Sequence, residues 1–244
     1  MAETALLFSA VSKSYGAAPA LQAVDLAVSR GESFGLVGMN GAGKTTLIKC
    51  LLDFCSLGAG RIEIFGVAHH HSAARSRLTF LPERFVPPYY LTGRDFLEYM
   101  LELQSVRFDA EAVERTLRAL DLDASALRLP VRHFSKGMTQ KLGLAACLLS
   151  GRELLVLDEP TSGLDPKARA LLKARLAAAR AAGHTVFLTS HALADVDEIC
   201  DRIAVLHAGR SMFTGTPAEL RARYATDSLE SAYLRCIDGA TADA

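Results

Sequence analysis

The chain has 244 residues, half of them hydrophobic and 22% charged, which is typical of a globular protein and excludes a largely disordered one. Lys plus Arg and Asp plus Glu both number 27, so no basic surplus points to nucleic acid. The length suits one large α/β domain with a subdomain.

The first part of the chain is predicted to contain strands and one helix. Residues 5–9 and 21–28 have strand character, and residues 33–37 (Ser-Phe-Gly-Leu-Val) form an apolar strand-like run. A helix is expected to follow and to reach about Phe54. Its apolar residues at helical spacing are Leu47, Ile48, Leu51 and Leu52.

Residues 38–46, between that strand and that helix, read Gly-Met-Asn-Gly-Ala-Gly-Lys-Thr-Thr and fit the P-loop pattern G-x-x-x-x-G-K-[ST]. The glycines let the backbone curl so that its N–H groups converge on an anion at a helix N-terminus. Lys44 adds a cation for the β- and γ-phosphates, and the Thr45 hydroxyl is placed to bind Mg²⁺. The motif predicts binding of ATP or GTP.

The middle of the chain changes from strands to helices. Residues 61–65 and 78–81 are predicted as two short strands, and the pattern is helical from about 84 to 145. The residues expected to cap helices here are Thr92, which forms a capping box with Asp95, and Asp109.

After Ser150 strands and helices alternate, which implies a mainly parallel sheet covered by helices. Asp165 and Pro166 are expected to open a helix that Gly183 closes. The last 20 or so residues are weakly patterned, as in a small appendage or a partly disordered tail. The strands predicted in this part are 154–157, 185–189 and 203–206.

Two acids follow the apolar strand 154–157, in an arrangement that resembles a Walker B motif. Asp158 is then expected to hold Mg²⁺ through its water shell. Glu159 is then expected to act as the general base that orients and polarises the attacking water. Acids at the end of a strand also begin ordinary solvated loops, so this segment alone leaves both interpretations open.

Further segments narrow the family. Residues 134–138 (Phe-Ser-Lys-Gly-Met) resemble the signature loop of ABC-type ATPases, and residues 162–165 (Ser-Gly-Leu-Asp) resemble their D-loop. His191 resembles their switch histidine, and Tyr15 stands where the family places an aromatic that stacks on adenine. Together the motifs resemble the nucleotide-binding subunit of an ABC transporter over residues 4–224. No Asn-Lys-x-Asp guanine motif occurs, which argues against a GTPase.

The resemblance implies an α/β fold of the P-loop NTPase class: a RecA-like core with an antiparallel β-portion and a helical subdomain. We expect the core and its β-portion at 1–83 and 146–224, and the helical subdomain that carries the signature at 84–145. A short C-terminal tail would occupy 225–244.

The resemblance also implies ATP hydrolysis with Mg²⁺ in a head-to-tail dimer, where each ATP touches the P-loop of one chain and the signature of the other. Lys44, Glu159 and His191 would be catalytic, and Thr45, Asp158 and Glu83 would form the metal site. The residues expected to contact the nucleotide are Tyr15, Gly38, Asn40, Gly41, Ala42, Gly43, Lys44, Thr45, Thr46, Ser135, Gly137, Asp158 and Asp165.

The chain departs from the family pattern at three positions. Lys136 replaces a usual glycine and Met138 a usual glutamine, a variant similar to that of ABC-2-type exporter ATPases. Glu83 stands where a glutamine is usual, so its contact with Mg²⁺ and water stays open against a plain surface glutamate. Lys136 either adds a cation near the partner's ATP or points to solvent or to the membrane partner.

We therefore expect an ATPase subunit that pairs with a second copy and energises a separate transmembrane permease, most simply for export, without a role for nucleic acid. Alternatives are an importer ATPase, a soluble ABC ATPase acting on DNA or ribosomes, and a catalytically silent binding module. The longest apolar stretch, Leu142 to Leu149, is too short to span a bilayer, and the N-terminus does not read as a secretory signal. The expected location is cytoplasmic, peripheral on the inner face of the cell membrane.

Cysteine and histidine are the two other residue types that could support metal or redox chemistry. The five cysteines contain no C-x-x-C pair and are expected to be buried free thiols. The three histidines at 69–71 invite a metal site, but adjacent histidines on a strand cannot all face one ion, so a solvated loop is expected.

Overall fold

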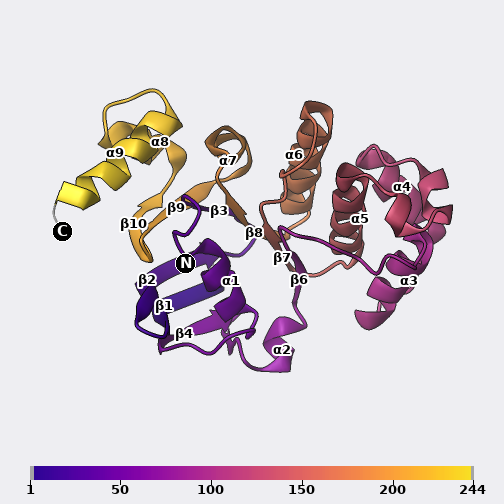
Figure 1. The fold of residues 1–244 in the computed structure, drawn as a ribbon, viewed down its shortest axis with the longest axis horizontal. Helices are drawn as coiled ribbons and strands as arrows, with labels where there is room; N and C mark the ends of the chain where they lie inside the picture. Colours follow the sequence, from indigo (N-terminus) through magenta and orange to yellow (C-terminus); the bar gives the residue numbers. More distant parts are fainter. Residues whose placement is uncertain (1–2, 243–244) are drawn as a thin grey trace.

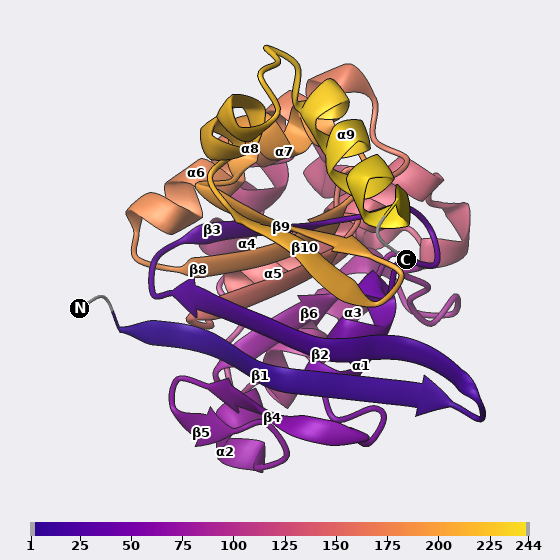
Figure 2. The ribbon, with the colours of Figure 1, turned by 90° about the vertical axis from the view of Figure 1, so that its left-hand side faces the viewer.

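The computed structural model describes residues 3–242. Its centre is a six-stranded sheet of order β10-β9-β3-β8-β7-β6, parallel except for β10 at one edge. A four-stranded antiparallel sheet of order β2-β1-β4-β5 forms a second layer (Figures 1 and 2). The strands are β1 (Thr4–Tyr15), β2 (Ala18–Ser29), β3 (Ser33–Val37), β4 (Ala59–Ile64), β5 (Val67–Ala68), β6 (Leu78–Leu81), β7 (Leu154–Asp158), β8 (Thr185–Ser190), β9 (Arg202–His207) and β10 (Arg210–Gly215).

Helices surround the six-stranded sheet. Helices α3, α4 and α5 form a group at one end of the molecule, and α8 and α9 lie at the other end (Figure 1). Two 3₁₀ turns, at Ala124–Arg128 and Val131–His133, connect α4 to α5. The helices are α1 (Lys44–Leu51), α2 (Ser72–Arg75), α3 (Gly93–Leu103), α4 (Ala110–Ala119), α5 (Lys136–Leu149), α6 (Pro166–Ala181), α7 (Leu193–Ile199), α8 (Pro217–Arg223) and α9 (Leu229–Ala242).

The central strands β3, β7 and β8 are buried along their whole length because the two faces of their sheet contribute to two different cores. In β8, Val186 and Leu188 belong to a core shared with the outer helices. Phe187 belongs to the core between the two sheets, where its ring centroid lies 6.0 Å from that of Phe8 and 6.1 Å from that of Phe34. A side chain on either face is thus buried, as expected for a parallel sheet covered on both sides.

The predicted helix caps are confirmed. The Thr92 hydroxyl accepts the Asp95 N–H at 3.1 Å, and the Asp95 carboxylate accepts the Thr92 N–H at 3.1 Å. The Asp109 carboxylate accepts two N–H groups at the start of α4. At the start of α6, the Asp165 carboxylate accepts the Ala168 N–H at 2.8 Å and Pro166 takes the first helical position.

Several boundaries differ from the sequence predictions. Helix α1 ends at Leu51 rather than near Phe54, and Asp53 already has a φ of +62°. The expected domain boundary at 145 falls inside α5. The weakly patterned C-terminal segment contains α9, whose Ala232 and Cys236 are buried. Residues 1, 2, 243 and 244 of the expected ranges lie outside the described residues. Among residues 3–242, none of the helices combines the length and apolar character that a bilayer crossing requires.

The expectation of a solvated histidine loop is wrong for His69 and confirmed for His70 and His71. His69 is buried, its N–H donates to the Ile62 carbonyl at 3.0 Å, and its Nδ1 lies 3.2 Å from the same oxygen. Burial lowers the pKa of His69. The histidine therefore supports the turn between β5 and α2.

Candidate functional site

The P-loop lies between β3 and α1, and its shape depends on glycine. Gly43 has a φ of +110°, and a Cβ there would lie 2.8 Å from the Ala20 carbonyl oxygen. A Cβ at Gly38 would lie 2.5 Å from the Leu206 carbonyl oxygen. Neither position has room for a side chain, because real Cβ atoms do not approach other atoms so closely. The loop therefore brings bare backbone to the start of α1.

Lys44 is the first residue of α1, and its side chain is only 7% exposed. Its ammonium donates a hydrogen bond to the Gly38 carbonyl at 2.5 Å and lies 3.6 Å from the Glu159 carboxylate. The loop and the end of β7 enclose a cavity of about 160 Å³. Its lining consists of Ala20, Met39, Asn40, Gly41, Gly43, Lys44, Thr45, Thr46, Glu83, Asp158 and Glu159.

Asp158 ends β7 and is buried. The Thr189 hydroxyl donates to one carboxylate oxygen of Asp158 at 2.5 Å, and the Thr45 hydroxyl lies 3.5 Å from the other. Burial, followed by the nearby carboxylates of Glu159 and Glu83, raises the pKa of Asp158, while Thr189 and Lys44 oppose the shift. A hydroxyl and carboxylates are the oxygen ligands that Mg²⁺ prefers, and the raised pKa indicates a carboxylate that would gain from a bound cation. These residues fit a Mg²⁺ ion.

Glu159 is held in an unusual conformation. Its φ of +50° lies in the left-handed region, which is strained for a residue with a long side chain. The Thr189 hydroxyl accepts the Glu159 N–H at 3.0 Å. The Glu159 carboxylate lies 2.8 Å from Nδ1 of His191 and also accepts the His191 N–H at 3.3 Å. The strained backbone thus turns the carboxylate towards both Lys44 and His191.

The structure brings some of the other predicted site residues to this cavity. Asn40, Gly41, Thr46 and Glu83 line the same cavity as Lys44. Ala42 is buried and does not line the cavity, and its carbonyl accepts the Gly209 N–H at 3.0 Å.

Tyr15, at the end of β1, is half exposed and does not line the P-loop cavity. Its hydroxyl donates to Sγ of Cys55 at 3.8 Å, a contact that raises its pKa, and it also interacts with the Thr46 side chain of the P-loop. The exposed ring thus lies next to the start of α1.

Thr189 is a site residue that the sequence analysis missed. Its hydroxyl links Asp158 to the backbone of Glu159, so one side chain positions both acids. The available signal was its place at the end of an apolar strand, directly before Ser190 and His191.

Three predicted site residues lie away from the P-loop cavity of their own chain. Ser135 caps α5 by accepting the Met138 N–H at 3.2 Å, and Gly137 follows it. Asp165 caps α6. None of the three lines the P-loop cavity. In a single chain they are therefore separate from Lys44 and Glu159.

Lys136 lies against the D-loop of its own chain. A Cβ built on Gly163 would come within 2.8 Å of Cε of Lys136 and 3.2 Å of its Nζ. A second contact joins the same two segments, because the buried Gln140 side chain donates to the Pro160 carbonyl at 3.3 Å. The start of α5 is thus attached to the loop that follows Glu159.

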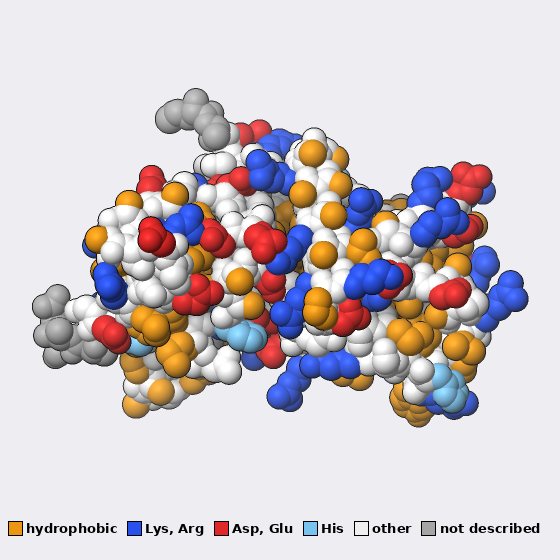
Figure 3. Space-filling view, turned by 90° about the horizontal axis from the view of Figure 1, so that it is seen from above, with side chains coloured by type: hydrophobic (Ala, Val, Ile, Leu, Met, Phe, Trp, Pro, Cys, Tyr) orange, Lys and Arg blue, Asp and Glu red, His pale blue; other side chains and the backbone are white. Residues whose placement is uncertain are grey.

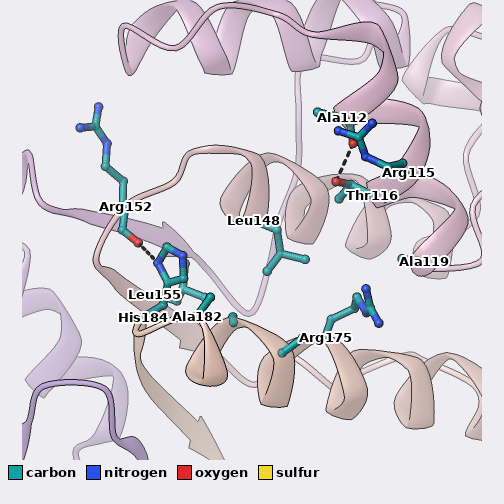
Figure 4. Close-up of a pocket in the computed structure, with 12 residues that line it drawn as sticks. Ala112, Arg115, Thr116, Ala119, Leu148, Arg152, Leu155, Arg175, Ala182 and His184 are labelled. Carbon is teal, nitrogen blue, oxygen red and sulfur yellow. Dashed lines mark hydrogen bonds between the residues drawn. The ribbon is translucent and has the colours of Figure 1, made fainter.

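A separate cavity of about 420 Å³ lies between α4, α5 and α6 (Figure 4). Arg115 and Arg175 border it, while the Arg152 side chain points away and is engaged with Gln104. His184 is held by the Arg152 carbonyl, 2.8 Å from its Nδ1. This cavity shares no lining residue with the P-loop cavity.

Comparison with known proteins gives a consistent result. The sequence profile described as ABC transporter matches residues 21–162. The chain is 39% identical over 234 residues to the daunorubicin resistance ATP-binding protein DrrA3 of Streptomyces coeruleorubidus, covering 94% of this chain and 74% of that protein. It is 37% identical over 220 residues to the Nod factor export ATP-binding protein I of Rhizobium etli, covering 89% and 70%.

A solved structure described as the ATP-binding subunit of an ABC transporter superposes with a TM-score of 0.87 at 31% identity, covering 95% of this chain and 99% of that one. The chain spans 57% to 74% of the length of its curated bacterial relatives.

Proposed function

The chain belongs to the ABC transporter family as an ATP-binding, ATP-hydrolysing domain, and we propose that it works as one half of a homodimer that drives export through a separate permease. The observation that carries the proposal is the single cavity that joins the P-loop, Lys44, Asp158 and Glu159. That arrangement supports phosphoryl transfer to water, in which catalysis consists of positioning and charge stabilisation.

In the proposed mechanism, the backbone of the P-loop binds the phosphates of ATP and Tyr15 stacks on the adenine. Lys44 leaves Glu159 to bind the β- and γ-phosphate oxygens. Glu159, freed from this ion pair, accepts a proton from the attacking water. His191, held by Glu159 through Nδ1, contacts the γ-phosphate and stabilises its developing charge.

Thr45, Asp158 and Glu83 are the residues proposed to hold Mg²⁺. When bound, the ion neutralises charge on the β- and γ-phosphates. Glu83 lines the cavity beside Asp158, which supports its inclusion over a plain surface role. Thr189 keeps Asp158 oriented for the ion through its short hydrogen bond.

The proposed dimer explains why Ser135, Gly137 and Asp165 lie outside the P-loop cavity of their own chain. Ser135 is exposed at the N-terminus of α5, where free N–H groups favour an anion. In a head-to-tail dimer these residues complete the site of the partner. We propose accordingly that 84–145 is the subdomain that presents the signature, that 1–83 and 146–224 form the core, and that 225–244 is an appendage.

The proposed permease docks beside Glu83. A cavity of about 560 Å³ there includes Phe85, Val86, Tyr89 and Lys136 in its lining. Val86 is 85% exposed and Tyr89 is 68% exposed, which is unusual for large apolar side chains on a free surface. Because Glu83 belongs to both cavities, a partner here would contact the nucleotide site directly.

Export is favoured over the alternatives by the relatives, two of which are named for drug resistance and for Nod factor export. On the face drawn in Figure 3, basic and acidic side chains are interspersed, which gives no support to action on DNA or ribosomes. The proposed location is the inner face of the cell membrane, where the permease would hold the chain.

Co-purification tests the proposal. The tagged chain should recover a membrane protein from detergent-solubilised membranes of its own host. Val86→Asp and Tyr89→Asp should abolish recovery, while Leu234→Asp, which changes an apolar side chain of α9 that is 53% exposed, should not. Absence of any membrane protein would contradict the transport role, and equal recovery with all variants would contradict the docking surface.

A further inference from the structure

Two cysteines lie side by side at the end of α1. Sγ of Cys50 and Sγ of Cys55 are 3.6 Å apart. Cys50 is completely buried within α1, whereas Cys55 lies in the following turn and is partly exposed. A disulfide has an S–S length of about 2.05 Å, so the sulfurs need to approach by about 1.5 Å.

The turn that carries Cys55 is connected to Tyr15. The Tyr15 hydroxyl donates to Sγ of Cys55 at 3.8 Å. The Lys13 ammonium donates to the Ser56 carbonyl at 2.7 Å and lies 5.3 Å from the centre of the Tyr15 ring. The Gly58 N–H donates to the Ser12 carbonyl at 2.8 Å. A shift of this turn therefore acts on the end of β1, where Tyr15 lies.

We propose that Cys50 and Cys55 form a reversible disulfide when the protein meets hydrogen peroxide, and that this disulfide weakens ATP binding through Tyr15. The second part rests on the proposed contact of Tyr15 with adenine. Transient disulfides are the usual form of thiol chemistry in reducing compartments, where they serve as sensors.

The chemistry needs one peroxide molecule for each disulfide. The Cys55 thiolate attacks one peroxide oxygen, the O–O bond breaks, and Cys55 sulfenic acid and hydroxide form; the hydroxide takes the thiol proton and leaves as water. Cys50 sulfur then attacks the Cys55 sulfur. The S–S bond forms, the S–O bond breaks, and the departing hydroxide leaves with the Cys50 proton as a second water. The two thiols lose two electrons and the peroxide gains them.

The two thiols have different roles in this sequence. Cys55 reacts first because peroxide reaches it, whereas burial raises the pKa of Cys50 to about 12 and makes it the slower, resolving thiol. Since Cys50 is fixed inside α1, closing the bond moves Cys55. The Tyr15 hydroxyl then loses its thiol partner, and the adenine-binding ring loses the contact that orients it.

Mass spectrometry tests the bond directly. Trypsin cleaves after Lys49 and Arg61 and releases a peptide, 50–61, that contains both thiols and no other cysteine. After peroxide treatment of the folded chain, this peptide should lose two hydrogen masses and resist alkylation, and dithiothreitol should reverse both changes. Failure of the folded chain to form this bond would overturn the proposal.

Calorimetric titration with Mg²⁺·ATP tests the consequence. Oxidation should weaken ATP binding about fivefold, the size of one lost hydrogen bond. Cys55→Ser removes the thiol that peroxide attacks and leaves a hydroxyl beside Tyr15, so its ATP affinity should not respond to peroxide. Cys236→Ser keeps the pair and should respond like the unmodified chain. A disulfide that leaves ATP affinity unchanged would overturn the proposed link.

Tyr15 variants separate this proposal from the proposed function. Tyr15→Phe should bind ATP more weakly when reduced and should lose little more on oxidation. If Tyr15→Ala binds ATP as tightly as the unmodified chain, the adenine contact and the proposed link both fail. The mass test of the disulfide is unaffected by that result.

Discussion

The ammonium of Lys44 lies 3.6 Å from the carboxylate of Glu159, so the lysine that is proposed to bind phosphate pairs with the proposed general base. Both side chains are almost fully buried, which makes the pair an alternative to the phosphate contact rather than an addition to it. In the proposed mechanism, binding of ATP draws Lys44 to the phosphates and releases Glu159 towards water.

The first prediction follows from this pair. Glu159→Gln removes the proton acceptor and the ion pair, so ATP hydrolysis should fall about 10²–10⁴-fold while ATP still binds. The variant should also accumulate as an ATP-bound dimer on a sizing column. Glu153→Gln is the control, because Glu153 pairs with Arg77 outside the cavity. Near-normal turnover of Glu159→Gln would remove the role assigned to Glu159.

The second prediction concerns pH. The raised pKa of Asp158 means that its carboxylate takes up a proton at a higher pH than the ordinary value of 3.8. In the proposed site Mg²⁺ needs the ionised form, so the Mg²⁺-dependent part of ATP affinity should weaken as the pH is lowered from neutral, before exposed aspartates protonate. Titration calorimetry with and without Mg²⁺ measures it, and a pH-independent Mg²⁺ effect would contradict it.

The stability of the folded chain should depend on pH in the opposite direction to its Mg²⁺-dependent ATP affinity. The folded chain binds the Asp158 proton more tightly than the unfolded chain, so this contribution is complete below pH 3.8 and is lost as the pH rises through the raised pKa. Asp158→Asn, which is never charged, should therefore unfold at a higher temperature than the unmodified chain at neutral pH without nucleotide.

The third prediction tests the backbone of the P-loop. Gly43→Ala places a Cβ 2.8 Å from the Ala20 carbonyl at a φ of +110°, so the loop must change shape. We expect at least a tenfold loss of ATP affinity and about 1–3 kcal/mol less stability. Gly183→Ala is the matched control, since its φ is +92° and its Cβ would meet nothing within 4 Å. Gly183→Ala should lose stability and keep its ATP affinity. Equal ATP affinity in both variants would be evidence against phosphate binding by the P-loop backbone.

The fourth prediction concerns assembly. If each site borrows the signature of its partner, the rate of hydrolysis should rise faster than linearly with protein concentration. Ser135→Arg should abolish hydrolysis while ATP affinity changes little, because Ser135 lies outside the P-loop cavity of its own chain. Ser135→Asn keeps a cap on α5, so its rate of ATP hydrolysis should fall less than that of Ser135→Arg. A rate strictly proportional to concentration would indicate a monomeric enzyme.

The sequence predicts the fold and the place where the P-loop meets the acids after β7, for physical reasons. The P-loop and the acids after β7 are local patterns, and a parallel sheet brings the ends of its strands together at one edge, so Lys44 and Asp158 meet without further information. The Thr92 and Asp165 caps were predictable because capping acts within four residues.

The remainder depends on contacts between distant segments. Nothing near His69 in the sequence reveals that its side chain would be buried next to the Ile62 carbonyl. Helix α9 is weakly amphipathic, and its burial comes from packing against α7, α8 and β10. The position of Lys136 over Gly163 depends on where the loop after β7 passes α5. The spacing of apolar residues in the sequence does not predict that position.

In the proposed dimer, the contacts between α5 and the loop after Glu159 would couple the two ATP sites. The end of α5 that would hold the partner's nucleotide is fastened to its own chain's loop through Gln140 and Lys136. A change at one Glu159 would then weaken the contacts of α5 with the other ATP. The two sites should therefore hydrolyse ATP in alternation rather than independently. In mixed dimers with a single Glu159→Gln chain, Gln140→Ala in that chain should raise hydrolysis at the intact site towards half the normal rate. If the intact site already hydrolyses ATP at half the normal rate without Gln140→Ala, the two sites are independent.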